Sequence, residues 1–503
     1  MLDSPFSAVA VNLPGGIVPA GDLLSVLSAA ESAGVERVQL GHRQQLLLAV
    51  EPARCKVLLA ALAAADLLGE PEADAHPNIV SSFAGENVFY NATWLREGVY
   101  KDILDLLDYR PRLKINLVDG RQSFVPFFTG HLNFIASETS NYWHLYVRFP
   151  RAGALYAWPH LVYSEDIPVL SAAVERVLLA SPVSFADAVD AADAAAAAGA
   201  RLHAQVSAAQ PLRQPPVAVP LVLPVFTLPY YEGFNQVGQQ LWLGIYRRDE
   251  LFSVAFLKDL CQVCLQTRVG QLCTTPWKSL IIKGIASDDR PLWDAVLCRH
   301  RLNVRHAANE LNWQVEDRCP AGLALKHELV RHLNEEDVRT YQLCFAIKTR
   351  LQTGLFGSIV VRRHQQLASE QYEILHTRDF NPNSRDFVPF RQRVQRERLG
   401  WYLTELCHQF YAQMCAETAL PEAPASSAIE PLSVLIVSPL PRCRHCLTVY
   451  DAVYGDPAQG VEAGTPWAEI NNYQCPTCEA PAANFEWWNE PVAAVGADLR
   501  VAS

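Results

Sequence analysis

The chain has 503 residues, of which 50% are hydrophobic and 19% are charged, so it can bury the cores of two or more domains. Its formal charge of −11 argues against a general nucleic-acid binder, because phosphate recognition needs a clustered basic face. No segment approaches the roughly 18 uninterrupted apolar residues of a membrane helix, and Met-Leu-Asp-Ser-Pro lacks the basic start of a secretory signal. Thirteen cysteines, an odd number that includes CxxC pairs, fit a reducing compartment, so we expect a cytoplasmic protein.

The first block of the chain begins with a predicted helix. In DLLSVLSAAESAG, residues 22–34, Leu23, Leu27 and Ala30 recur at helical spacing, and the closing glycine is a typical helix end. VERVQLGHRQQLLLAV, residues 35–50, is rich in leucine and β-branched residues, and we interpret it as a strand. PARCKVLLAALAAADLLG, residues 52–69, then predicts a second helix that opens with proline.

The middle block repeats this kind of order. Its segments QQLWLGIYRR, ELFSVAFLKDLCQVCLQ, QLCTTPWKSLIIKGI and PLWDAVLCRH predict strand, helix, strand and helix between residues 239 and 300. Two such β-α-β units imply an α+β protein built by internal duplication. Cys261 and Cys264 form a CxxC pair on the first of these helices, and we interpret them as small buried side chains rather than half of a metal site.

Two segments rich in alanine and proline divide the chain. AADAAAAAGARLHAQVSAAQ passes into PLRQPPVAVPLVLP, where proline removes backbone donors and favours an extended connection, and ALPEAPASSAIEP has the same character. The predicted organisation is a first half at 1–190, an Ala/Pro-rich linker at 191–224, a second half at 225–418, a linker at 419–439 and a C-terminal domain at 440–503.

Four cysteines near the C-terminus form two further CxxC pairs, Cys443 with Cys446 and Cys475 with Cys478. CxxC is the shortest spacing at which a tight turn points two sulfurs inward, so two such turns can supply the four thiolates of a tetrahedral metal site. The 28 residues between the pairs exceed the roughly 15 to 20 of common zinc ribbons. They include GDP at 455–457 and GTP at 464–466.

With these motifs, residues 440–488 resemble a rubredoxin. The resemblance implies that the four cysteines bind one iron ion, which cycles between the ferric and ferrous states and passes single electrons. It also implies an aromatic core beside the iron, made of Tyr450, Trp467, Tyr473 and Phe485.

Two positions depart from the rubredoxin pattern. Rubredoxins usually carry glycine directly after each CxxC pair, where this chain has Leu447 and Glu479, so we expect strained turns or altered hydrogen bonds to the sulfurs. Zinc in place of iron remains open, since four-thiolate sites accept either metal. Residues 440–503 carry three basic and eight acidic residues, a net charge of −5 that could steer the domain onto a basic partner.

The body resembles the siroheme-dependent nitrite and sulfite reductases over about 20–180 and 235–415. The matching residues are Arg43, Gln44 and Gln45 in the first strand, and Asn133 in PRLKINLVDGRQSFVPFFTGHLNFIA. The implied fold is α+β, a duplicated body with ferredoxin-like half-domains followed by the small rubredoxin-like domain. Arg43 and Lys278 match basic positions suited to siroheme carboxylates, with surface charges as the simpler alternative.

Several residues that this reductase family needs are missing. Its siroheme is bridged to a four-iron cluster whose cysteines come as C-x5-C and C-x3-C, and neither pair occurs here. Cys319 stands where the first ligand would fall, but Leu325 stands at the second. Gln39 and Cys273 replace basic residues that the two halves would offer. The sequence therefore argues against both siroheme and an iron–sulfur cluster.

These observations predict a one-electron transfer protein, an electron carrier more than a catalyst. It would carry an iron–tetrathiolate centre on a reductase-like scaffold and donate electrons in nitrite or sulfite assimilation. Its expected partners are redox proteins, such as a siroheme nitrite or sulfite reductase and a reductase donor, with no nucleic acid and no membrane. Two alternatives stay open: an active siroheme-type oxidoreductase with a fused rubredoxin, and a non-redox protein with structural zinc.

Overall fold

The structure is a computed structural model. It describes residues 7–71, 75–90, 94–149, 155–180, 191–210, 212, 215–350, 354–364, 370–418, 440–452, 455–456 and 459–488. The chain divides into two compact units, a body at Met1–Glu417 and a C-terminal unit at Thr418–Ser503. The linker predicted at 419–439 lies outside the described residues.

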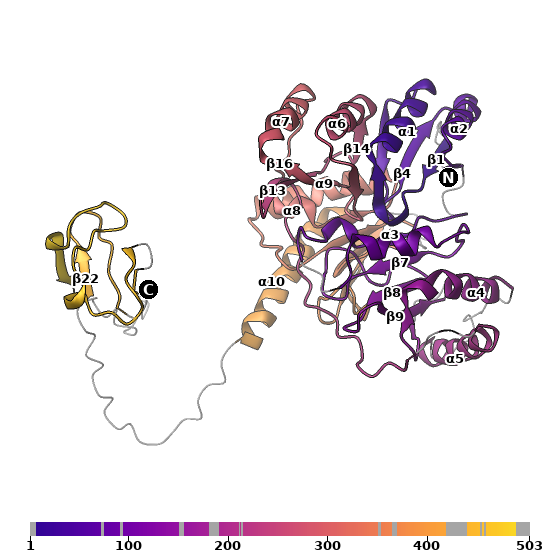
Figure 1. The fold of residues 1–503 in the computed structure, drawn as a ribbon. Coiled ribbons are helices and arrows are strands. Elements are labelled where there is room, and N and C mark those ends of the chain that lie inside the picture. The colour runs from indigo at the N-terminus through magenta and orange to yellow at the C-terminus, as the bar shows by residue number, and fades with distance from the viewer. Residues whose placement is uncertain are drawn as a thin grey trace, which may run out of the picture. The chain divides into compact units, whose positions relative to one another are not determined.

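Two five-stranded antiparallel sheets at one end of the body share a hydrophobic core with α1, α2, α6 and α7 (Figure 1). The first sheet has the order β14 (Leu251–Ser253), β3 (Arg37–Leu40), β4 (Leu46–Val50), β1 (Ser7–Val11), β5 (Gly69–Glu70) and lies with α1 (Ala20–Ser32) and α2 (Cys55–Ala64). The second has the order β12 (Gly233–Val237), β13 (Gln240–Ile245), β16 (Leu280–Ala286), β15 (Gln271–Thr274), β2 (Ile17–Pro19) and lies with α6 (Val254–Gln266) and α7 (Arg290–Arg299).

The two sheets exchange edge strands. β14, from the second half of the sequence, pairs with β3, and β2, from the first half, pairs with β15. α1 also packs directly against α6. Each half therefore completes the sheet of the other, as expected when two duplicated units fold together, and the predicted duplication of ferredoxin-like units is confirmed.

Two segments that we interpreted as single strands are hairpins instead. Residues 35–50 form β3 and β4, and residues 271–285 form β15 and most of β16. In each turn one side chain adopts a left-handed backbone conformation, Gln44 at φ 64° and Lys278 at φ 55°. The left-handed position of each turn is occupied by a residue other than glycine, and neither turn has an Asn-Gly pair, so hydrophobic periodicity alone did not reveal the break in the strand.

The other two sheets of the body are mixed and also repeat one plan, with three parallel strands followed by antiparallel ones. One contains β6 (Val80–Ser81), β7 (Ile115–Val118), β8 (Leu132–Ala136), β9 (Tyr142–Arg148), β10 (Leu155–Ala157) and β11 (Val162–Tyr163). The other contains β17 (Trp313–Val315), β18 (Phe345–Lys348), β19 (Ile359–Arg363), β20 (Gln371–Thr377) and β21 (Phe387–Gln395). Asn133 lies in β8, as the sequence predicted.

Helices complete the body: α3 (Glu97–Asp105), α4 (Ile167–Ala180), α5 (Ala191–Ala209), α8 (Ala308–Leu311), α9 (Pro320–Glu335) and α10 (Leu399–Thr418). Short 3-10 turns occur at η1 (Pro14–Gly16), η2 (Pro52–Arg54), η3 (Phe83–Gly85), η4 (Ser164–Asp166), η5 (Ser287–Asp289) and η6 (Arg396–Arg398). None of the helices in the described ranges has both the length and the apolarity to cross a membrane.

The alanine-rich part of the predicted linker at 191–224 folds as α5. This helix packs beside α4 and β10 (Figure 1). Ala195, Ala198, Leu202 and Val206 recur on one face and are buried in the core under the first mixed sheet. The small alanine side chains let the helix approach the sheet closely, so this segment is part of the body's core.

The C-terminal unit is built around a two-stranded antiparallel sheet of β22 (Leu440–Cys443) and β23 (Phe485–Trp488). Cys443 lies opposite Phe485 in its register. The intervening chain forms turns with two short 3-10 segments, η8 (Trp467–Glu469) and η9 (Ala482–Asn484).

Candidate metal centre

Each CxxC pair of the C-terminal unit lies in a tight turn, and the two turns are built alike. In the first, the Leu447 amide donates to the Cys443 carbonyl at 2.9 Å. In the second, the Glu479 amide donates to the Cys475 carbonyl at 2.9 Å. Leu447 has φ 66° and Glu479 has φ 58°, the left-handed region that favours glycine. The expected strain after each CxxC pair is therefore present in the backbone.

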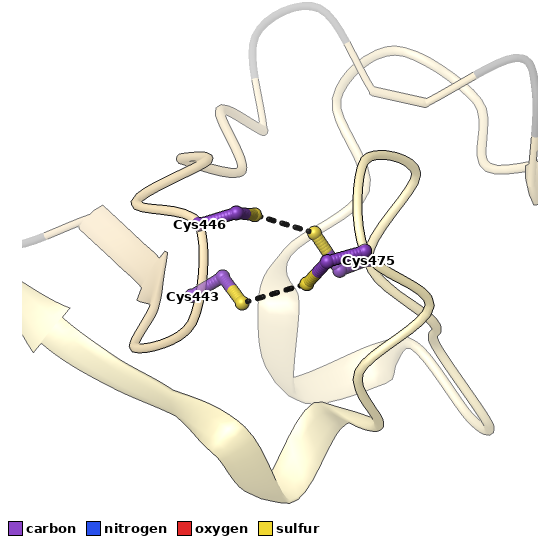
Figure 2. Close-up of side chains that lie close together, drawn as sticks. Cys443, Cys446 and Cys475 are labelled. Atoms are coloured by element: carbon purple, nitrogen blue, oxygen red, sulfur yellow. Dashed lines mark hydrogen bonds between the residues drawn. The ribbon is translucent and has the colours of Figure 1, made fainter.

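The two turns bring all four sulfurs together. The Sγ atoms of Cys443, Cys446, Cys475 and Cys478 lie within 4.8 Å of one another. Cys443 Sγ lies 3.6 Å from Cys478 Sγ, and Cys446 Sγ lies 3.3 Å from Cys475 Sγ. Figure 2 shows the sulfurs of the first turn facing those of the second.

These separations fit a metal ion better than disulfides. Metal–sulfur bonds of about 2.3 Å in a tetrahedron place neighbouring sulfurs about 3.8 Å apart, whereas a disulfide brings them to about 2.05 Å. Within the described residues, no other group of three or more histidine, cysteine or acidic side chains converges in this way. The four cysteines are therefore suited to one tetrahedrally bound ion.

The aromatic core implied by the sequence packs beside the cysteines. The Trp467 ring centroid lies 4.7 Å from that of Phe485 and 5.0 Å from that of Tyr473, and Tyr450 lies 5.4 Å from Trp467. Phe485 also packs against the buried cysteines. Cys443 and Cys475 are fully buried, whereas Cys478 is exposed. The aromatic cluster is confirmed, and it leaves one edge of the site open to solvent.

A hydroxyl group contacts one of the sulfurs. Thr448 Oγ1 lies 3.1 Å from Cys446 Sγ and 2.9 Å from Thr477 Oγ1. Hydrogen bonds from the Thr448 side chain and backbone lower the pKa of Cys446 to about 6. Thr448 was not among the residues predicted from the sequence. The sequence feature that could have indicated it is a hydroxyl side chain two positions after the second cysteine of a CxxC pair.

Residues 441–485 match the rubredoxin family model. This part of the chain is a rubredoxin domain. Two anaerobic nitric oxide reductase flavorubredoxins are similar to the chain. The protein from Klebsiella pneumoniae subsp. pneumoniae is 36% identical over 85 residues, and the one from Salmonella paratyphi A is 35% identical over 82. The matches cover 15% of this chain and 18% and 17% of those proteins, so the chain spans less than a fifth of their length.

The body has a structural relative. The structure of Mycobacterium tuberculosis NirA protein aligns with a TM-score of 0.57, covering 84% of this chain and 82% of that one at 16% identity. Identity at this level shows a shared fold alone. The predicted fold class, a duplicated α+β body with ferredoxin-like half-domains and a rubredoxin-like domain, is confirmed.

Arg43, predicted as a tetrapyrrole ligand or a surface charge, is 4% exposed, so the surface alternative is wrong. Its guanidinium donates to the Asn78 carbonyl at 2.7 and 3.0 Å and to the Ile115 carbonyl at 3.0 Å. These bonds tie the β3–β4 hairpin to β7. Arg43 thus has a structural role here, and its role toward a tetrapyrrole stays a prediction.

Lys278, the other predicted ligand, is also buried at 4% exposure. Its Nζ lies 2.5 Å from Glu250 Oε2 and 3.4 Å from Asp317 Oδ1. Asp317 Oδ2 lies 2.6 Å from His42 Nδ1. Burial lowers the pKa of Lys278, but the two carboxylates raise it to a net value above the usual range. Lys278 therefore joins an ion cluster with Glu250, Asp317 and His42, whereas Arg43 donates to the carbonyls of Asn78 and Ile115.

The remaining cysteines that the sequence singled out lie in the body's interior. Cys261 and Cys264 are fully buried on α6, and burial raises the pKa of each to about 12, so their interpretation as packed thiols is confirmed. Cys319 caps α9, where its sulfur accepts from the Gly322 amide at 3.3 Å. Leu325 is buried in the core beneath that helix.

Proposed function

We propose that the protein transfers single electrons through a mononuclear iron–tetrathiolate centre in its rubredoxin domain. The body would act as a scaffold without siroheme or an iron–sulfur cluster. The physiological setting would be nitrite or sulfite assimilation in the cytoplasm. The partners would be a reductase donor and an acceptor such as a siroheme nitrite or sulfite reductase.

The convergence of four sulfurs within 4.8 Å carries this proposal. Iron bound there supplies a ferric/ferrous couple, which transfers one electron at a time. The two CxxC turns hold the four cysteine ligands in place, and the packed rings of Tyr473 and Trp467 exclude water from one side of the site. Cys478 and Leu447 are exposed on the open side, where a partner could approach to the short distance that electron transfer needs.

The scaffold role rests on the residues at the missing cluster positions. Leu325 packs with Leu329 and Phe345 in a hydrophobic core, where a cluster ligand would need an open coordination site. Cys319 is already used as a helix cap. Trp277 fills the junction of the two halves with the first mixed sheet, and its indole donates to the Phe124 carbonyl at 2.7 Å. These contacts support a body that is packed with protein side chains.

Metal analysis with a visible spectrum tests the proposal on the full chain. We expect one iron per chain and a red oxidised form that bleaches reversibly with one electron. The matched control is Cys475→Ser, which removes one buried ligand and should abolish the colour.

Each alternative predicts a different result in the same experiment. One equivalent of zinc without colour, in protein made without added zinc, would establish the structural-zinc alternative. Siroheme absorbance with at least four further iron atoms would establish an active reductase and overturn the scaffold role. The nitric oxide chemistry in the names of the similar flavorubredoxins is not proposed, because the shared segment is 15% of this chain.

A further inference from the structure

The loop FNPNSRDF between β20 and β21 contacts a second loop from the other half of the body. The Phe127 amide donates to Asn383 Oδ1 at 3.2 Å, and Arg385 Nη1 donates to the Phe128 carbonyl at 2.6 Å. Asn383 and Arg385 are thus held against residues 127–128, which precede β8. The contact joins the two mixed sheets of the body.

A second guanidinium is anchored on the next two carbonyls of the same loop. Arg148, at the end of β9, donates from Nε to the Gly130 carbonyl and from Nη2 to the Thr129 carbonyl, each at 2.9 Å. Gly354, on the connection that follows β18, also lies here, since a Cβ on it would be 3.6 Å from the Thr129 oxygen. Three carbonyls in a row therefore hold two arginines side by side.

A third cation, Lys348 at the end of β18, belongs to the same cluster. Burial and the charges of Arg385, Arg362 and Arg148 lower the pKa of Lys348 to about 8. Burial and the charge of Arg385 also lower the pKa of Arg148 to about 10. The backbone agrees with this placement, because Gly354, which follows Lys348 on the connection after β18, adjoins the Thr129 carbonyl that accepts from Arg148. In the sheet, Lys348 lies opposite Arg362 of β19.

Carboxylates in the described part of the chain do not balance this charge. Neither Arg148, Lys348 nor Arg385 forms an ion pair there. The charge of Glu316 raises the pKa of Lys348 against these effects, but one carboxylate leaves an excess of positive charge among the three cations. The Glu316 oxygens also accept hydrogen bonds from Thr349 Oγ1 and the Arg350 amide. Residues 150–154 and 351–353, the adjoining segments, contain no aspartate or glutamate in the sequence.

An unsatisfied donor accompanies the cations. Asn383 is 2% exposed, and its Nδ2 has no hydrogen-bond partner within the described ranges, although its Oδ1 is used by Phe127. A buried amide donor without an acceptor is costly, so this group needs an acceptor from outside the protein, either an ordered water or a ligand. We propose that Arg148, Lys348, Arg385 and the Asn383 amide form a binding site for a small oxyanion with two or more negative charges, such as inorganic phosphate or sulfate.

The donor set suits this ligand class. Guanidinium groups and an ammonium form charge-assisted hydrogen bonds with the oxygens of phosphate and sulfate, and a multiply charged anion balances several cations at once. The site uses residues other than Arg43 and Lys278, whose groups are bound to protein carbonyls and carboxylates. It does not depend on the metal centre, so it goes beyond the proposed electron transfer.

Thermal unfolding of the full chain with sodium phosphate or sodium sulfate tests the site, with sodium chloride at matched ionic strength as the reference. Both oxyanions stabilise proteins in general by exclusion from the surface, so the expected signal is a saturable rise in Tm. Lys348→Met should leave the chloride Tm unchanged or higher, because it removes a charge from like-charged neighbours. It should weaken oxyanion binding by about ten- to a hundredfold. Lys56→Met, on the exposed face of α2, is the charge-matched control.

Asn383→Asp distinguishes a cationic binding site from a purely structural role of Asn383, because the two predict changes in Tm of opposite sign. The new carboxylate keeps the acceptor for the Phe127 amide and places a negative charge among the cations. We expect a higher Tm in chloride and loss of the saturable oxyanion response. A lower Tm for this variant would show that the surroundings are not cationic and would overturn the proposal. So would an oxyanion response that is absent from the unmodified chain or unchanged in Lys348→Met.

Discussion

The turn residues Leu447 and Glu479 offer a direct test of how the metal site is built. Both adopt left-handed backbone conformations, at φ 66° and 58°, where an L side chain costs about 1–2 kcal/mol. Glycine avoids that cost but loses about 0.4–1 kcal/mol through the greater freedom of the unfolded chain. We therefore expect Leu447→Gly to stabilise the rubredoxin domain by about 0.5–1 kcal/mol.

The loss of the leucine side chain subtracts little from this gain, because Leu447 is 61% exposed. Glu479→Gly should act in the same direction. Since the two residues lie in separate turns, the double variant should gain about 1–2 kcal/mol if the effects add. Guanidinium unfolding followed through the metal–thiolate absorbance measures this as a higher midpoint.

Leu447→Ala separates backbone strain from side-chain effects. Alanine removes the leucine side chain but keeps the Cβ that disfavours positive φ, so it should give no stabilisation. Equal midpoints for Leu447→Gly and Leu447→Ala, or a lower midpoint for the glycine variant, would refute the strain argument.

The remaining predictions concern the ligands, a sulfur contact and the body's ion cluster. Cys475→Ser should lose stoichiometric iron while the thermal unfolding of the body stays unchanged, because Cys475 belongs to the C-terminal compact unit; a concurrent loss of body stability would contradict this. Thr448→Val should make the iron potential more negative, with a tenfold change in the one-electron equilibrium equal to about 59 mV, whereas Thr448→Ser, which keeps the hydroxyl, should not; cyclic voltammetry decides. Burial alone raises the pKa of Asp317, but His42 and Lys278 lower it well below the usual range, so its stabilisation is complete above about pH 4 and is lost as the pH falls. Asp317→Asn should cost about 3–5 kcal/mol at pH 7 and progressively less in acid; urea unfolding across pH would show a constant difference if this is wrong.

The metal site could be predicted from the sequence because its chemistry is local. Each CxxC pair fixes two sulfurs within one turn, and the missing glycines at Leu447 and Glu479 are visible without any coordinates. The rubredoxin aromatic residues come with that motif. The contact of Thr448 with Cys446 was not predicted, since the direction of a hydroxyl depends on the folded turn.

The sequence also determined the helices α1, α2, α6 and α7 and the duplication of the units that contain them, because hydrophobic periodicity is a property of adjacent residues. It did not show that residues 35–50 and 271–285 are hairpins or that α5 lies within the predicted linker. Tertiary structure decided what those elements pair with. β14 completes the sheet of the other half, and Lys278 is buried because Glu250 and Asp317 arrive from distant parts of the chain. The cationic cluster likewise forms because Arg148 and Arg385 both donate to carbonyls of the same loop, although 236 residues separate the two arginines in sequence. Charge neutralisation and burial depend on distances in space. Only the fold could therefore show which ionisable groups have an oppositely charged partner in the described part of the chain and which do not.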